Sequence, residues 1–306
     1  SISTGVIPTP VESIEEFKMA TSNQTADFAN SAGSQVQMIT RRGSNQLHGS
    51  VYEYYFGSNV GAANNWKNNH TPSRDLPYTP LPKSHYNRFG ATAGGPVTPD
   101  FLGGRWYLFG NFEGYRYPNN TTYTATVPTP LMRAGVIQVQ DRSGKYAAYN
   151  LNPFPVTVGG VTYQPATCGP NNVPCDPRGI GLNPVINQLW SKYMPLPNDA
   201  QYGDTYNTQG FRAPIRIPEN SNTVVGRIDH DFGPNWHFMG VYRYYKDKAY
   251  GTSQVDVGGL LPGCTFGQPC SVYTTPNQPW SMVAGLTTII TNHLTNDFRF
   301  AYVRNL

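Results

Sequence analysis

Hydrophobic and polar residues alternate along several stretches of about ten residues. In Arg105–Tyr117, one face carries charged and amide side chains such as Glu113, whereas the other carries only apolar side chains and glycine from Trp106 to Gly114. Alternation with a period of two is typical of a β-strand whose two faces meet different surroundings. The pattern predicts seven strands: Leu47–Phe56, Tyr86–Val97, Arg105–Tyr117, Thr223–Phe232, Trp236–Tyr245, Trp280–Ile290 and Thr295–Arg304.

The length of these strands and their apolar faces suggest contact with lipid. About ten residues is the length that a tilted strand needs to cross a bilayer. The opposite faces carry charge, and we predict that they line a barrel lumen or touch a plug inside it. The alternative is the solvated face of a sheet in a soluble protein. The proposed lumen-facing residues are Glu113, Arg227, Asp229, Arg243 and Arg299.

Short and long connections alternate strictly between the predicted strands. The short ones are 98–104, 233–235 and 290–295, and the long ones are 57–85, 118–222 and 246–279. Outer-membrane barrels have short periplasmic turns and long extracellular loops. Seven strands cannot close a bacterial barrel, and an open edge in lipid leaves backbone groups without partners. We therefore expect an all-β fold, a partial antiparallel transmembrane β-barrel whose further strands lie outside this sequence.

Composition narrows the classes that remain. Only 13% of the 306 residues are charged, about half the usual share of a soluble domain. No run approaches the roughly 20 apolar residues of a spanning helix, and the mean hydropathy is negative, which excludes a bundle of apolar helices. The 22 basic residues are scattered, whereas nucleic-acid binding requires a basic stripe. We expect membrane lipid, and no nucleic acid, as a partner.

The four cysteines form two local pairs in Pro- and Gly-rich segments, Cys168 with Cys175 and Cys264 with Cys270. Zinc binding is the competing interpretation, but the CxxC form is missing and no histidine lies nearby. Disulfides within loops fit better, and they indicate an oxidising compartment outside the cytoplasm. No signal peptide is visible at Ser1.

Two loop features predict local structure or binding. In the longest connection we expect a helical turn over Leu131–Val136 and a short helix over Val185–Tyr193, opened by Asn183 as N-cap and Pro184. The Tyr- and Asn-rich external stretches 52–69 and 198–207 are candidates for binding sugar or peptide, and simple exposed polarity is the alternative.

Aromatic residues near the strand ends suggest the belts that flank the apolar band of an outer-membrane barrel. Ordinary packing within a sheet is the alternative, because aromatic residues favour strands in any protein. The proposed girdle residues are Trp106, Tyr117, Trp236, Tyr245 and Trp280.

Catalytic signals are missing. Glu15 and Glu16 are adjacent, and adjacent side chains on exposed backbone usually point apart. The six histidines show no ligand spacing such as HExxH. The sequence contains no G-x-S-x-G turn and no phosphate-binding loop. We expect no enzyme activity, no cofactor and no metal site.

Residues 1–45 differ from the rest and are predicted to be the end of a plug domain and its hinge, with 46–306 as the N-terminal part of the barrel. Motifs throughout the chain resemble those of TonB-dependent outer-membrane receptors, in particular the Oar-like branch, in which a carboxypeptidase-regulatory-like domain usually precedes the plug. The matching segments are ESIEEFK, TSN with ADFANSAG, T-x-x-G-S-N, HGS, NRFG with GGP, FEGYR, VPTPLMRAG, NPVINQLWSKYMPLPN and GRIDHDFG. The family often has a second glycine where Ser34 stands, and one basic residue where Arg41 and Arg42 stand.

This resemblance implies active uptake of a nutrient, such as an oligosaccharide, peptide or chelate, across the bacterial outer membrane. The family's plug blocks the barrel and moves when the TonB energy-coupling complex pulls on it, through a region that this sequence does not contain. A surface structural or adhesive protein that displays large loops is the alternative from another class. A secreted soluble β-sandwich with disulfide-bonded loops is a third.

Overall fold

Two compact units make up the chain in the computed structural model. The structure describes residues 7–20, 35–57, 85–101 and 104–305. The first unit consists of Ser1–Asn119, Pro218–Ala249 and Thr275–Leu306, and the second consists of Asn120–Ile217 and Tyr250–Thr274.

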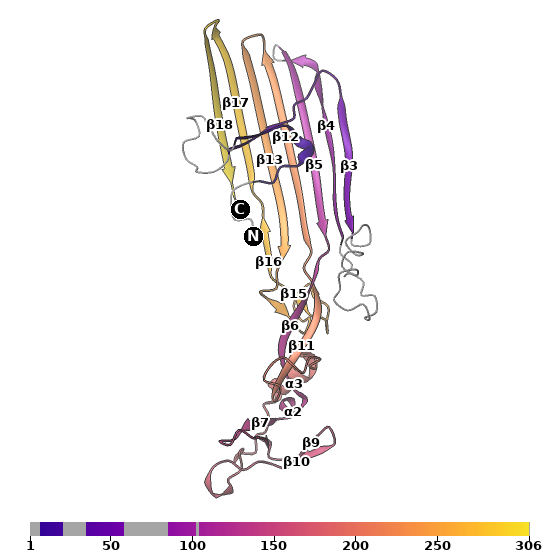
Figure 1. The fold of residues 1–306 in the computed structure, drawn as a ribbon, viewed down its shortest axis with the longest axis vertical. Coiled ribbons are helices and arrows are strands. Elements are labelled where there is room, and N and C mark those ends of the chain that lie inside the picture. The colour runs from indigo at the N-terminus through magenta and orange to yellow at the C-terminus, as the bar shows by residue number, and fades with distance from the viewer. Residues whose placement is uncertain (1–6, 21–34, 58–84, 102–103, 306) are drawn as a thin grey trace. The chain divides into compact units, whose positions relative to one another are not determined.

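One antiparallel sheet forms the body of the first unit (Figure 1). Its strands follow in the order β18-β17-β13-β12-β5-β4-β3, so that each pairs with its neighbours in sequence among these seven, and β16 (Thr274–Asn277) pairs with β13. All seven strands predicted from alternation are present, and several are longer than ten residues. They are β3 (His48–Gly57), β4 (His85–Phe101), β5 (Gly104–Tyr117), β12 (Glu219–Phe232), β13 (Trp236–Tyr250), β17 (Trp280–Thr291) and β18 (Leu294–Arg304).

The N-terminal segment, 7–20 and 35–46, belongs to the same unit. A 3₁₀ turn, η1 (Val11–Ser13), leads into β1 (Ile14–Ala20), which pairs antiparallel with β2 (Gln35–Thr40). The motif segments within 21–34 lie outside the described residues, as does 58–69, the larger part of the Tyr- and Asn-rich stretch 52–69, whose first residues belong to β3.

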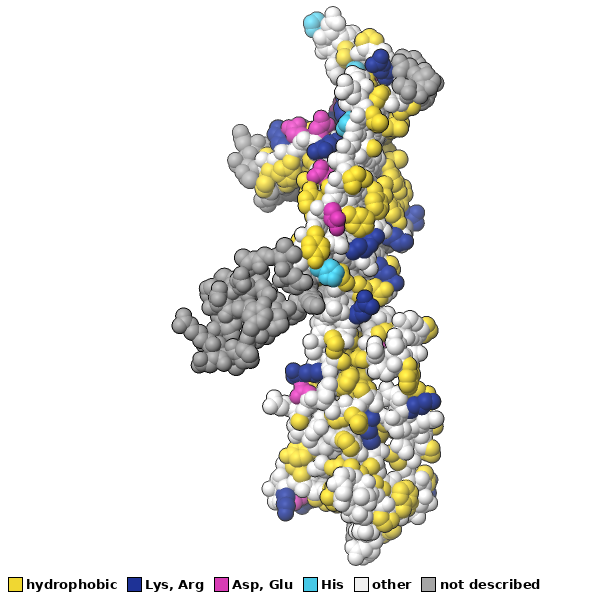
Figure 2. Space-filling view, turned by 90° about the vertical axis from the view of Figure 1, so that its right-hand side faces the viewer, with side chains coloured by type: hydrophobic (Ala, Val, Ile, Leu, Met, Phe, Trp, Pro, Cys, Tyr) yellow, Lys and Arg dark blue, Asp and Glu magenta, His cyan; other side chains and the backbone are white. Residues whose placement is uncertain are grey.

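The two faces of the large sheet differ in exposure, and the apolar face is the exposed one, which is the opposite of the arrangement in a soluble protein. Its charged face, on which the N-terminal segment packs, buries Tyr107, Phe109, Val225, Val241 and Tyr245. Its apolar face leaves large hydrophobic side chains exposed. A soluble sandwich covers such a face with a second sheet. The exposed side chains of this apolar face include Val51, Leu108, Phe112, Val224, Tyr242, Met282, Phe298, Phe300 and Tyr302. Figure 2 shows hydrophobic side chains spread along this strand-bearing part.

The second unit contains small hairpins and short helices. Thr129 caps α2 (Pro130–Arg133), and Val136 already begins a strand, so the expected turn over Leu131–Val136 is shorter than predicted. The helix α3 (Pro184–Tyr193) is confirmed, because Asn183 accepts hydrogen bonds from the amides of Val185 and Ile186. Four strand pairs were not predicted: β6 (Asn120–Pro128) with β11 (Thr208–Arg216), β7 (Val136–Gln140) with β8 (Tyr146–Asn150), β9 (Val156–Val158) with β10 (Val161–Tyr163), and β14 (Val255–Asp256) with β15 (Cys270–Ser271). None of the described helices is long and apolar enough to span a membrane.

Hydrogen bonds made by polar side chains order this second unit. The guanidinium of Arg133 donates to the carbonyls of Trp190, Met194 and Pro195, which closes the C-terminal end of α3. Burial lowers the pKa of Arg133. In the turn between β7 and β8, the hydroxyl and amide of Ser143 donate to Asp141, and these hydrogen bonds lower the pKa of that carboxyl group.

Both predicted disulfides are present, Cys168–Cys175 and Cys264–Cys270, each between residues six or seven positions apart. Closing a loop of this size stabilises it by about 2–3 kcal/mol. We expect the double substitution Cys264→Ser/Cys270→Ser to increase amide hydrogen exchange throughout 258–271. The pair Cys168→Ser/Cys175→Ser is the matched control and should leave that segment unchanged. Labelling of any cysteine by a maleimide in the native, unreduced protein would contradict the assignment.

Candidate functional site

The charged face of the large sheet carries all five residues proposed to face a lumen. Alternation and register place them together, because Arg227 and Asp229 on β12 share a face with Glu113 on β5, Arg243 on β13 and Arg299 on β18. The structure thus brings the five onto one surface. Whether this surface faces a lumen stays a prediction at this point.

An ion pair lies at the centre of this face. Arg227 donates to Asp229 through Nε at 2.9 Å and Nη2 at 2.8 Å, and the two side chains are only 12% and 10% exposed. Such a buried pair keeps its geometry because either partner alone would leave an uncompensated charge. The remaining nitrogen of Arg227, Nη1, donates to the backbone carbonyl of Thr40 at the end of β2.

Thr40 is the point where the N-terminal segment meets the sheet. Its hydroxyl accepts a hydrogen bond from Nη2 of Arg243 at 2.8 Å, while its carbonyl accepts the one from Arg227. Thr40 is 4% exposed. Two arginines on neighbouring strands therefore hold one residue of the N-terminal segment. We call these three residues, Thr40, Arg227 and Arg243, the Thr40 clasp.

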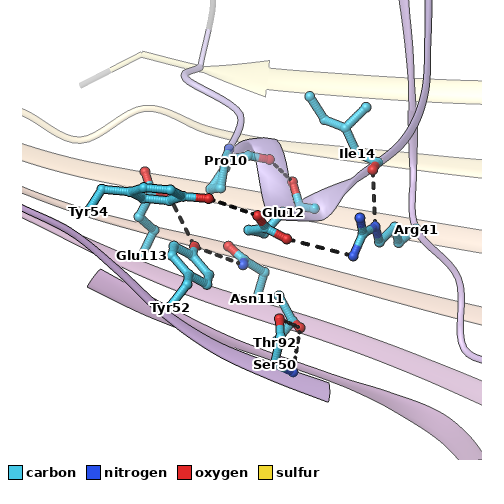
Figure 3. Close-up of polar contacts among 11 residues, drawn as sticks. Pro10, Glu12, Ile14, Arg41, Ser50, Tyr52, Tyr54, Thr92, Asn111 and Glu113 are labelled. Atoms are coloured by element: carbon cyan, nitrogen blue, oxygen red, sulfur yellow. Dashed lines mark hydrogen bonds and ion pairs between the residues drawn. The ribbon is translucent and has the colours of Figure 1, made fainter. Parts of the chain in front are cut away.

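Glu12 in the turn η1 makes a second contact between the segment and the sheet (Figure 3). Its carboxylate accepts a hydrogen bond from the hydroxyl of Tyr54 on β3 at 3.0 Å and lies 3.8 Å from Nη1 of Arg41. Arg41 also donates through Nε to the carbonyl of Ile14. The residues of η1 and the end of β2 are thereby tied to each other and to β3.

The polar link from β2 to β3 passes closely over the sheet at Gly43. A Cβ atom at Gly43 would lie 2.5 Å from the backbone oxygen of Leu108 and 2.8 Å from that of Gly95. Two residues further on, the side chain of Asn45 accepts a hydrogen bond from the hydroxyl of Tyr107 at 2.7 Å. Only glycine allows this approach, because a backbone oxygen cannot move away as a side chain can.

Substitution of Gly43 tests this close approach of the link to the sheet directly. We expect Gly43→Ala to displace the link and cost about 1–3 kcal/mol of stability, as overpacking generally does. Amide hydrogen exchange across 35–46 should rise, and mass spectrometry can measure it. Gly226→Ala is the matched control, because a Cβ atom there meets nothing within 4 Å. Unchanged exchange in both variants would show that the link does not rest on these strands.

Two polar clefts border the same link. The larger, of about 700 Å³, is lined by Glu15, Arg41, Arg42, Ser44 and His48, among others. The smaller, of about 250 Å³, also contains Arg42 and is lined by charged residues of β12 and β18 and by His237 of β13. No group of three His, Cys, Asp or Glu side chains in the described residues is arranged to hold a metal ion. These clefts offer space for water beside the N-terminal segment.

The proposed girdle residues divide between the two faces. Trp106, Trp236 and Trp280 lie on the apolar face, Trp106 and Trp236 at the end with short turns and Trp280 near the end with long connections. Tyr117 and Tyr245 lie on the charged face, where Tyr245 is buried. These two tyrosines therefore do not belong to a belt around the apolar face, because alternation places them beside Glu113 and Arg243.

Sequence reasoning found the charged residues but missed their partners. Alternation identified Arg227 and Arg243, whereas Thr40, Gly43 and Tyr54 carried no separate signal. The motif T-x-x-G-S-N spans Thr40 and Gly43, and was the only feature that could have marked both.

Comparison with known proteins gives one match. The family model described as "Outer membrane beta barrel domain" matches residues 39–306. This range contains all seven long strands and the second unit. No curated protein and no solved structure is similar enough to match the chain.

Proposed function

Because the chain belongs to the outer membrane β-barrel domain family, and so lies in the bacterial outer membrane, we propose that it is part of an active transporter. In this proposal the seven strands are one section of a larger barrel, and their charged face lines its lumen. The N-terminal segment is the end of a plug inside that lumen.

The observation that carries the proposal is the N-terminal segment held against the charged face. The Thr40 clasp and the contact between Glu12 and Tyr54 join it to three different strands, β12, β13 and β3. A barrel that only displays loops needs no segment fixed to its inner wall. A plug requires polar contacts of this kind, because they hold it in place and can still be exchanged for water when it moves.

The edges of the sheet favour a larger barrel. Among the residues that the structure describes, β3 and β18 are its outermost strands, and each pairs on one side only. In hydrocarbon every unpaired N–H and C=O costs several kcal/mol, so spanning strands form closed barrels. Further strands pairing with both edges satisfy this requirement. The soluble sandwich considered above does not fit the family or the exposed apolar face.

Movement of the plug needs a source of free energy and a signal. The resemblance to TonB-dependent receptors supplies the expected source, a pull from the TonB complex of the inner membrane. The signal is substrate binding outside, which shifts the plug only if the substrate binds its two positions with different affinity. We propose a nutrient such as an oligosaccharide, peptide or chelate as the substrate.

Removal of the N-terminal segment tests whether it closes a pore. In the full-length protein, deletion of residues 7–46 should make cells sensitive to vancomycin, a hydrophilic antibiotic too large for ordinary porins. The intact protein, expressed at the same level, should leave sensitivity unchanged. The mobility of unheated samples on electrophoresis gels provides the folding control, since folded barrels migrate differently from unfolded ones.

Two outcomes would favour the alternative of a surface structural or adhesive protein. One is a folded deletion variant that admits no antibiotic, because the segment then blocks nothing. The other is uptake that continues unchanged in cells lacking TonB, which would remove the energy-coupled step.

A further inference from the structure

Six aromatic side chains gather on the charged face at the end of the strands where the long connections leave. We call them the tyrosine platform. Phe56 and Tyr86 lie with their ring centroids 5.2 Å apart, and Tyr86 lies 5.7 Å from Tyr115 and 6.3 Å from Tyr117. The register confirms the shared face, since Tyr86 pairs with Phe56. The platform consists of Tyr52, Tyr54 and Phe56 on β3, Tyr86 on β4, and Tyr115 and Tyr117 on β5.

Two of the six platform side chains are exposed and the other four are half-buried, whereas other aromatic residues of this face are buried. Tyr54 and Phe56 are 50% and 49% exposed, whereas Tyr107 and Phe109, nearer the beginning of β5, are 9% and 4% exposed. Exposed apolar surface of this kind commonly marks a binding site. On the charged face it is not explained by contact with lipid.

Hydrogen-bonding groups lie between the rings. The hydroxyl of Tyr52 donates to Glu113 at 3.2 Å and accepts from the side-chain amide of Asn111 at 3.3 Å (Figure 3). Arg88 lies 3.7 Å from the same carboxylate and 5.6 Å from the centre of the Tyr115 ring. Arg88 and Glu113 carry opposite charges, and Glu219 of β12 pairs with Tyr117 in the register at the border of the platform.

We propose that the tyrosine platform binds a neutral oligosaccharide. This inference rests on the proposed function, because it names the substrate class of the transporter. A pyranose ring offers an apolar face of C–H groups to an aromatic ring and hydroxyl groups at its rim. Tyrosine rings can stack on the apolar face of the sugar, and amide, carboxylate and guanidinium groups can form hydrogen bonds with its hydroxyl groups. The internally compensated pair of Arg88 and Glu113 favours a ligand without net charge.

A ligand on the platform would contact a residue that also holds the N-terminal segment. Tyr54 belongs to the platform, and its hydroxyl holds Glu12, which lies beside Arg41. A sugar stacked on Tyr54 competes for this hydroxyl group. The platform therefore favours a ligand-bound state in which the contact between η1 and β3 is weaker, which is the differential affinity that transport requires.

Calorimetry on the full-length protein in detergent micelles tests the proposal. The probes are maltohexaose, cellohexaose and xylohexaose, and we expect at least one to bind. Tyr86→Ala and Tyr115→Ala should each weaken that binding about tenfold, the loss expected when one aromatic contact is removed. Tyr86→Phe keeps the ring and should bind nearly as well as the unsubstituted protein, which separates lost stacking from misfolding.

Tyr55→Ala is the matched control, because Tyr55 is an exposed aromatic residue of β3 that lies on the opposite face of the sheet. It should leave binding unchanged. Absence of heat with all three hexasaccharides overturns the inference, and so does hexalysine binding that the platform substitutions abolish. If the deletion variant admits vancomycin but the full-length protein binds no sugar, only the inference is overturned. If the protein binds sugar but the deletion variant does not admit vancomycin, the transport proposal is overturned and the protein is a surface protein that binds sugar.

Discussion

Substitution of Arg227 by methionine should lower the free energy of unfolding by about 3–5 kcal/mol, the cost of breaking a buried ion pair from one side. The variant keeps most of the volume of the side chain but leaves Asp229 as a charge that is 10% exposed and without its bidentate partner. It also removes one of the two hydrogen bonds that hold Thr40. Urea titration of the purified protein in micelles, followed by tryptophan fluorescence, measures the loss.

Two controls separate the charge from the clasp. The double variant Arg227→Met/Asp229→Leu removes both charges and should recover most of the stability, since apolar replacement of a buried pair is often neutral. Arg299→Met disrupts a pair with Asp297 whose side chains are 69% and 45% exposed, and should cost less than about 1 kcal/mol. A single variant no less stable than the double variant would mean that water reaches Asp229 freely and that the pair is not buried.

Alternation alone placed the seven long strands correctly, because chemically different faces force a period of two. Each strand of this sheet pairs with its neighbour among the seven long strands, which a sequence with alternating short and long connections can indicate. The two cysteine pairs were also predictable, because residues six or seven positions apart within a loop can reach each other.

Contacts between distant segments could not be predicted from a local pattern. The hydrogen bonds to Thr40 join residues 187 and 203 positions apart, and their geometry depends on how the N-terminal segment lies on the sheet. The pairing of β6 with β11 likewise joins the two ends of a long connection. Tyr117 and Tyr245 were interpreted from their position at strand ends, although alternation already placed them on the charged face.

The tyrosine platform shows what a structure adds to a correct strand prediction. Tyr52 and Tyr86 belong to different strands, and only the register brings β3, β4 and β5 into rows that assemble their rings. In the sequence, these tyrosines look like ordinary aromatic residues of a strand. On the charged face, beside Glu113, they become a surface with a chemical preference.

The second large effect is expected on the apolar face. Phe300→Arg on β18 should destabilise the protein folded into phosphatidylcholine vesicles by about 2–4 kcal/mol, the cost of arginine near the bilayer midplane on the lipid side of a barrel. Phe300 lies near the middle of β18 and is 48% exposed, so about half of its side chain is not covered by protein. Urea titration of vesicle-bound protein, followed by tryptophan fluorescence, gives the difference.

The neighbouring residue provides the control, because successive side chains of a strand point to opposite faces. Ala301 is exposed, pairs with Val283 and shares the charged face with Arg299, so Ala301→Arg should leave stability nearly unchanged. A soluble protein would show the reverse preference or none, because water accepts an arginine at an exposed Phe300 as readily as at Ala301. Equal stability of the two variants would therefore contradict a hydrocarbon-facing surface, and with it the orientation of the lumen, the N-terminal segment and the tyrosine platform.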